Sequence, residues 1–240
     1  MNAPASDAVG WHDQIAENFS QGYDRSPRFQ ERFRLWQALI AAHVRPGDTV
    51  LDAGCGAGTF SFEAAKPAGQ VDAIDGSANM IALCRDRQQA QGIQNIAFET
   101  ALLESISARP QAHYDVVLCS SVLEYLPDLR AELKRLIDAL KPGGRLIFSL
   151  PNGESRYRKL EGLAFRLTGR PRYFEFVRNV VTADRASRLI GELGCRVMDT
   201  HYFAAPPVPM SIAPLFGTRP KSKTLFAMVA VKGGSDQSVS

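Results

Sequence analysis

The fold of this chain is restricted most by residues 49–60, where a short apolar strand runs directly into a glycine-rich turn. Their sequence is Thr-Val-Leu-Asp-Ala-Gly-Cys-Gly-Ala-Gly-Thr-Phe. Val50 and Leu51 end the predicted strand, the glycines allow a tight turn, and a helix is expected from Phe60 onward. A strand, a glycine turn and a helix in this order are typical of a cradle for a nucleotide-type cofactor in an α/β fold.

The glycine spacing and a nearby acid argue against a dinucleotide. A dinucleotide fingerprint needs its third glycine at the sixth loop position, which is Thr59 here, whereas the third glycine comes early, at Gly58. Asp52 stands two residues before the first glycine, where its charge would lie near an anionic pyrophosphate. A carboxylate there suits a cationic ligand end, such as the ammonium of a methionine moiety, because charge-assisted hydrogen bonds contribute roughly 1.5–3 kcal/mol. S-adenosylmethionine fits this description.

Several segments between Val50 and Asn152 resemble, in order, the motifs of the class I S-adenosylmethionine-dependent methyltransferases. The loop reads D-x-G-x-G-x-G, and residues 70–75 are similar to the family's second strand, which ends in an acid. By this resemblance Asp75 holds the two ribose hydroxyls and Met80 flanks the adenine. Asp75 follows Gly54 by 21 residues, and one carboxylate can accept hydrogen bonds from two hydroxyls.

Two later segments extend the resemblance. Residues 114–128 are similar to the family's fourth strand and the loop after it, which borders the transferable methyl. Residues 140–149 are similar to its helix-to-strand corner, where Gly143 and Gly144 are expected to end a helix. The resemblance implies a cofactor site formed by Tyr23, Asp52, Ala53, Gly54, Cys55, Gly56, Asp75, Gly76, Met80, Ala101, Leu102, Cys119 and Ser120.

The chain departs from the family pattern at two places. After the third strand, where many relatives have an Asp for the adenine amino group, residues 100–103 read Thr-Ala-Leu-Leu, so that contact is made by backbone or is absent. Relatives often have a His after the acid of the fourth-strand loop, but Tyr125 follows Glu124 here. For a phenol or enol acceptor, Tyr125 is the catalytic candidate by resemblance and Tyr23 the second. Glu124 either caps a helix, supports a neighbour or touches substrate.

Strand and helix patterns alternate along the chain, which favours a mostly parallel sheet covered on both faces. The predicted strands are 49–53, 70–74, 95–99, 114–119, 145–150, 195–203 and 224–231. The predicted helices are 12–20, 28–43, 60–66, 79–91, 129–140, 156–168 and 183–193. The resemblance implies an antiparallel last strand paired with the one before it. The expected fold is α/β: a Rossmann-like, doubly wound, mostly parallel seven-stranded sheet with an antiparallel edge hairpin.

A length of 240 residues with 45% hydrophobic content fits one domain spanning residues 1–240. We expect N-terminal lid helices in 1–45, a cofactor-binding core in 46–152, substrate-side helices and the hairpin in 153–232, and a flexible tail in 233–240. Phe19 and Tyr23 could form the lid. The alternative is that both pack an amphipathic helix onto the sheet.

The four cysteines lack C-x-x-C or metal-ligand spacing, which argues for a reducing compartment and against a disulfide framework or a metal site. The N-terminus lacks a basic region followed by an apolar one, and no apolar run approaches the roughly 20 residues of a membrane span. A cytoplasmic location is therefore predicted.

Residues 154–188 carry nine Lys or Arg against four acids, a net charge of +5, so that the remainder carries −2. Within them Tyr157, Leu160, Ala164 and Leu167 recur at helical spacing beside cations. Such a helix is typical of a substrate lid or a membrane-surface contact. The proline-rich, apolar residues 203–216 should lie near the carboxyl ends of the strands. Both segments favour a lipophilic substrate with an anionic group, unless the helix is only a solvated face and the loop only a cap on the core.

The predicted function is S-adenosylmethionine-dependent methyl transfer to a small, lipophilic or aromatic acceptor at oxygen. The alternatives are a C- or N-methyltransferase of a quinone, porphyrin or natural-product intermediate, and a non-catalytic S-adenosylmethionine-binding module. A nucleic-acid partner is not expected, because the polar-Pro-Pro-aromatic motif that grips a flipped base is absent after the fourth strand. A protein arginine methyltransferase would need a second acid beside Glu124.

Overall fold

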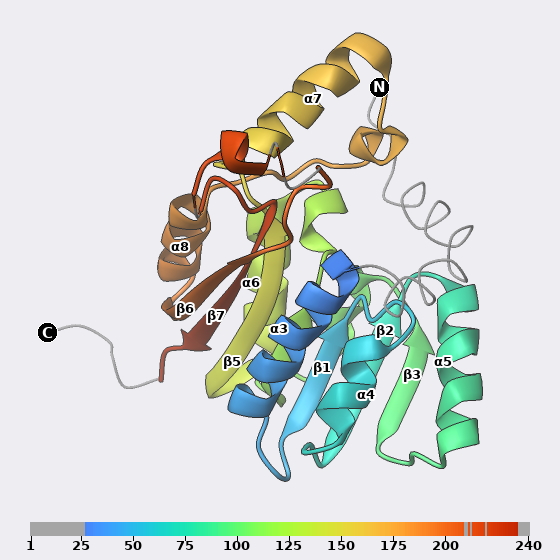
Figure 1. Ribbon diagram of the computed structural model, residues 1–240. Helices are drawn as coiled ribbons and strands as arrows, with labels where there is room; N and C mark the ends of the chain where they lie inside the picture. The colour runs from blue at the N-terminus through green and yellow to red at the C-terminus, as the bar shows by residue number, and fades with distance from the viewer. Residues whose placement is uncertain (1–26, 209–210, 212, 219, 235–240) are drawn as a thin grey trace, which may run out of the picture.

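The structure, a computed structural model, describes residues 27–208, 211, 213–218 and 220–234 (Figure 1). Seven strands form one sheet in the order β3-β2-β1-β4-β5-β7-β6. The strands are β1 Thr49–Ala53, β2 Gln70–Asp75, β3 Ile96–Thr100, β4 Tyr114–Cys119, β5 Leu140–Pro151, β6 Cys195–Phe203 and β7 Leu225–Lys232. The α-helices are α3 Pro27–His43, α4 Thr59–Ala65, α5 Ala78–Gln91, α6 Leu129–Ala139, α7 Arg156–Thr168 and α8 Ala183–Glu192. Short 3-10 helices are η1 Leu103–Ala108, η2 Leu123–Tyr125, η3 Arg172–Glu175 and η4 Ala213–Phe216.

The predicted fold class is confirmed. Strands β1 to β5 pair in parallel, and β7 is antiparallel to both of its neighbours, β5 and β6. Within the hairpin β7 lies inside and β6 forms the edge of the sheet. The parallel strands therefore present their carboxyl ends at one end of the sheet, which in Figure 1 is the end toward α7.

The start of β5 corrects one sequence prediction. Gly143 and Gly144 do not end the preceding helix, because α6 ends at Ala139 and Leu140 is already extended, with φ −74 and ψ 141. Pro142 disfavours a helical conformation at the residue before it, which forces the earlier end. Gly143, at φ +76, instead lies in the irregular first part of β5, where the pairing with β4 shifts register.

Two apolar layers hold the sheet between helices. On one face α6 and α8 pack on the strands through residues such as Leu133, Leu136 and Ile190. On the other face α3, α4 and α5 do so, and Trp36 of α3 is fully buried with its ring stacked on Phe60 of α4 at 4.9 Å between centroids. The N-terminal α3 is thereby fixed directly beside the glycine-rich turn.

The predicted helix at 12–20, Phe19, Tyr23 and residues 235–240 lie outside the described residues. The division of the chain into lid, core and substrate-side regions of one domain stays a prediction. No helix in the described part is long and apolar enough to cross a membrane.

Candidate functional site

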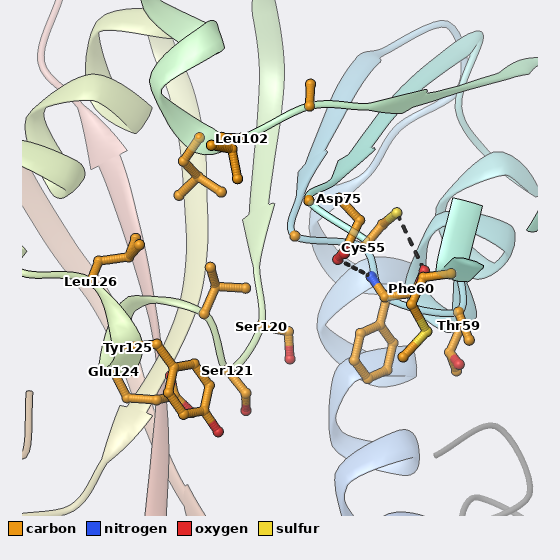
Figure 2. A pocket seen from close by; sticks show the side chains of 18 of the residues that line it. Cys55, Thr59, Phe60, Asp75, Leu102, Ser120, Ser121, Glu124, Tyr125 and Leu126 are labelled. Carbon is orange, nitrogen blue, oxygen red and sulfur yellow. Dashed lines mark hydrogen bonds between the residues drawn. The ribbon is translucent and has the colours of Figure 1, made fainter. Parts of the chain in front are cut away.

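A cavity of about 280 Å³ lies at the carboxyl ends of the parallel strands and is lined by the loops that follow β1 to β4. Its volume is near the lower end of the roughly 300–1,000 Å³ typical of small-molecule sites. Open α/β sheets bind ligands at this end. Figure 2 shows Asp75 and Cys55 on one side of the cavity, Glu124 and Tyr125 on the other, and Ser120 between them.

The glycine turn after β1 is fixed by backbone hydrogen bonds to β2. The amides of Gly54 and Cys55 donate to Ile74 O at 2.8 and 2.9 Å. Gly54 has φ +80, and a Cβ there would lie 2.3 Å from Cγ2 of Val122, so only glycine fits. At Gly56 an added Cβ would meet no atom of the other described residues within 4 Å, apart from its chain neighbours, and this position lines the cavity.

Asp75, at the end of β2, is held by two backbone amides. Oδ2 accepts from Gly56 N at 2.8 Å and Oδ1 from Ser77 N at 2.9 Å (Figure 2 draws the first bond). Ser77 in turn caps α5, because its Oγ accepts from Met80 N at 3.1 Å. Asp75 also lines the cavity, and a carboxylate can accept several hydrogen bonds at once, so it can take part in binding the hydroxyls of a ligand there.

Apolar side chains complete this half of the cavity. Met80 is almost fully buried, whereas Leu102 is 49% exposed, and both line the cavity beside Ala101. The amide of Ala101 donates to Asp75 O at 2.9 Å, so it is already engaged within the sheet. These side chains suit a flat, largely apolar ring such as adenine.

The carboxylate of Glu124, in η2, is buried at the edge of this site and has few hydrogen-bond partners among the described residues. It is 4% exposed, and within the described residues its Oε2 has no hydrogen-bond partner. Burial raises the pKa of Glu124 to about 7, although Arg32 and Arg158 favour its charged form. Burial also raises the pKa of the neighbouring Tyr125 phenol well above its usual range, so this hydroxyl stays protonated at neutral pH.

Two arginines also line the cavity, and neither was predicted. Arg32 of α3 donates from Nη2 to Ser120 Oγ at 2.7 Å, and its guanidinium lies 5.5 Å from the centre of the Phe60 ring. Arg158 of α7 donates from Nη1 to Tyr173 Oη at 2.7 Å. Both come from helices that the sequence pattern places outside the cofactor loops, so only their charge could have indicated them.

Nine of the thirteen residues predicted to bind the cofactor lie together along the cavity: Gly54, Cys55, Gly56, Asp75, Gly76, Met80, Ala101, Leu102 and Ser120. The candidate catalytic residue Tyr125 lines it as well. Tyr23 lies outside the described residues.

Three of the predicted positions, Asp52, Ala53 and Cys119, are buried and are not among the described residues that line the cavity. Ala53 and Cys119 pack in the apolar layer between the sheet and α6. Side chains along a strand alternate between its two faces, and these two point toward that layer. Asp52 is 1% exposed and accepts from Ser61 Oγ at 2.6 Å, and burial raises its pKa to about 7. Its carboxylate is thus engaged with Ser61 beneath the turn, and a contact with the ammonium of a ligand stays a prediction.

A model for a methyltransferase domain matches residues 45–173. Among curated proteins, the chain is similar to a ubiquinone biosynthesis O-methyltransferase of Xanthomonas axonopodis pv. citri, with 33% identity over 114 residues. That match covers 47% of this chain and 47% of the relative, so the chain spans about half the length of the curated relatives it matches.

Two solved structures share the fold. The [4+2]-cyclase SpnF superposes with a TM-score of 0.73 and 16% identity over 98% of each chain. A magnesium protoporphyrin IX methyltransferase of Synechocystis, crystallised with SAH, has a TM-score of 0.65 and 21% identity, with 86% of this chain and 85% of that chain covered.

Proposed function

Since the chain belongs to the class I S-adenosylmethionine-dependent methyltransferases, we propose that it transfers a methyl group to a hydroxyl oxygen of a small, lipophilic acceptor. The observation that carries this proposal is the two-sided cavity. One side offers the carboxylate of Asp75 and the glycine turn, and the other offers the buried Oε2 of Glu124, which has no hydrogen-bond partner among the residues that the structure describes.

S-adenosylmethionine is the cofactor, and the residues present fit it. Asp75 would hold its ribose hydroxyls, Met80 and Leu102 would flank its adenine, and the turn at Gly54 to Gly56 would lie against its methionine end. The sulfonium supplies an activated methyl group, so the protein has mainly to align the acceptor and exclude water. Because Asp52 is buried beneath the turn, the ammonium would be held by the turn's own backbone.

Glu124 is the better proton acceptor in this site, in place of Tyr125. A group with a pKa of about 7 is ionised in part at neutral pH and can take the proton of a hydroxyl as its oxygen forms the new bond to carbon. Tyr125, whose pKa is raised by burial, holds its proton and is suited to donate a hydrogen bond to the acceptor oxygen.

The rest of the acceptor side indicates the kind of molecule it takes. Val122, Leu126 and Leu225 give it apolar walls, and Arg32 and Arg158 add two cations. Such a lining favours an acceptor with an apolar body and an anionic substituent such as a carboxylate.

The names of the curated relatives support oxygen as the target, but they describe proteins that the chain matches over about half their length. Transfer to carbon or nitrogen is the first alternative. A non-catalytic S-adenosylmethionine-binding module is the second, and the likeness to a [4+2]-cyclase shows only that the two share a fold. A cytoplasmic location stays a prediction.

The test is to incubate the protein with S-adenosylmethionine labelled in its methyl group and a panel of phenols, phenolic acids and lipid extracts. Labelled product should carry the methyl on oxygen, by mass spectrometry. Glu124→Gln should slow transfer about 100-fold, in the range for loss of a general base. The matched control is Glu132→Gln, a buried Glu of α6 outside the cavity. Methylation only at carbon or nitrogen would refute the oxygen proposal.

A further inference from the structure

Helix α7 exposes a row of leucines rather than burying it. Leu160, Leu163 and Leu167 are 55%, 53% and 77% exposed. Their spacing of three and four residues places them on one face of the helix, and none of the residues of α7 is fully buried. Figure 1 shows α7 projecting beyond the carboxyl ends of the strands. An apolar row this exposed marks an interaction surface.

Leu215 extends the same surface. It is 72% exposed and lies in η4, which is joined to the start of α7. Arg156 Nη1 donates to Leu215 O at 3.4 Å, and the Tyr157 and Phe216 rings meet edge to face at 5.7 Å between centroids. These contacts place Leu215 beside the start of α7, near the three leucines of the helix. We refer to Leu160, Leu163, Leu167 and Leu215 as the leucine face.

Cations border the leucine face. Lys159 and Arg166 are exposed, and their helical positions lie directly beside the leucine row. Glu161, the acid of this helix, points the other way, where it pairs with Arg158 at 2.9 Å. An exposed apolar row with a basic border is the pattern of a helix that lies in the interface of an anionic bilayer.

The leucine face lies next to the acceptor side of the cavity. A groove beside α7 is lined by residues of that helix, such as Tyr157, Leu160 and Ala164, together with Tyr173 and Pro207. Arg158 lines both this groove and the cavity. A lipophilic molecule leaving a bilayer at the leucine face would therefore enter the groove close to Arg158, which also lines the cavity.

We propose that the leucine face and its basic border dock the protein on an anionic membrane surface. The leucines enter the boundary between headgroups and acyl chains, and Lys159 and Arg166 contact the lipid phosphates. The proposal goes beyond methyl transfer, since none of these four leucines is needed to hold the cofactor.

The experiment measures cosedimentation of the full chain with vesicles of phosphatidylglycerol mixed with phosphatidylcholine, and with vesicles of phosphatidylcholine alone. We expect binding to the anionic vesicles that weakens as salt is raised, because the Debye length is only about 10 Å at 0.1 M. Arg166→Glu and the double variant Leu163→Gln/Leu167→Gln should each lower the partition coefficient about tenfold.

Matched controls come from β6, where Arg196 and Met198 are exposed at the opposite end of the sheet. Arg196→Glu makes the same charge change, and Met198→Gln removes an apolar side chain that is 49% exposed. Both should bind vesicles like the unaltered protein. Circular dichroism confirms that every variant is folded.

The proposal is overturned if the folded protein does not bind anionic vesicles at low salt, if it binds both vesicle types equally, or if the β6 variants lose as much binding as the α7 variants. Sedimentation velocity tests the alternative that a second copy of the chain covers the leucine face. A dimer that Leu163→Gln/Leu167→Gln dissociates, without vesicle binding, would assign the leucine face to self-association instead. Neither result bears on the proposed methyl transfer, which is measured separately with a water-soluble phenol.

Discussion

Replacing Asp75 by Ala tests the placement of the cofactor most sharply. In the structure this carboxylate accepts from Gly56 N and Ser77 N and lines the cavity, where it can also accept from ligand hydroxyls. Hydrogen bonds to a charged group contribute roughly 1.5–3 kcal/mol. Loss of the ribose contact should therefore weaken S-adenosylmethionine binding about ten- to a hundredfold.

The assay is calorimetric titration with S-adenosylmethionine, accompanied by a thermal melt. Asp72→Ala is the matched control, because Asp72 lies on the same strand and accepts from Tyr114 Oη at 2.8 Å but does not line the cavity. It should lower stability by about 1–3 kcal/mol and leave the dissociation constant unchanged.

Asp75→Asn separates the two roles of the carboxylate, since it keeps one acceptor oxygen for the amides and cannot accept from both hydroxyls. It should melt closer to the unaltered protein than Asp75→Ala does and still bind the cofactor more weakly. Unchanged affinity in folded Asp75→Ala, or an equal loss in Asp72→Ala, would refute the assignment of the ribose contact.

Three further outcomes are expected. Gly54→Ala should destabilise the fold by roughly 1–3 kcal/mol in urea unfolding, because alanine is strained at φ +80 and its Cβ would meet Val122; wild-type stability would contradict the packing of the turn. The pKa of Glu124 is raised from 4.5 to about 7 in the folded state, so the folded protein holds more protons and the free energy of unfolding should fall as pH rises from 4.5 to about 7. Burial raises the pKa of Asp52 to about 7 as well, so Glu124→Gln should reduce this slope in pH-dependent melts without abolishing it, and an unchanged slope would exclude a contribution from Glu124. Trp36→Ala should cost about 3–5 kcal/mol, because it empties a fully buried position stacked on Phe60; a loss below about 1 kcal/mol would contradict that packing.

The elements of the fold followed from the sequence because apolar periodicity and turn residues agree along this chain. The predicted strand at 114–119 coincides with β4, and the helix at 156–168 coincides with α7. The start of β5 was missed because the two glycines suggested a helix end, whereas Pro142 had already ended the helix.

The sequence predicted only those site residues whose positions follow from the motif itself. Asp75 and the turn from Gly54 to Gly56 lie where a strand-turn-helix unit must place them. The burial of Asp52 was not foreseen, because spacing along a chain does not show that Ser61 donates a hydrogen bond to its carboxylate. Among the described residues Oε2 of Glu124 has no hydrogen-bond partner, because elements distant in sequence bury it, and no local pattern contains that information.

The exposed leucine row on α7 is a second feature that the sequence could not predict in full. The stripe predicted from the sequence, Tyr157, Leu160, Ala164 and Leu167, shares Leu160 and Leu167 with this row, but an amphipathic pattern cannot tell a buried face from an exposed one. Only the structure shows Leu167 in solvent while Phe165 packs on Phe174 at 5.5 Å between ring centroids.

The most direct test of the account is calorimetric titration of the purified, folded chain with S-adenosylmethionine and, separately, with NAD. The arrangement of Asp75 and the glycine turn predicts binding of S-adenosylmethionine in the micromolar range, about −8 kcal/mol, and no binding of NAD. Binding of NAD, or no binding of S-adenosylmethionine by the folded protein, would contradict it.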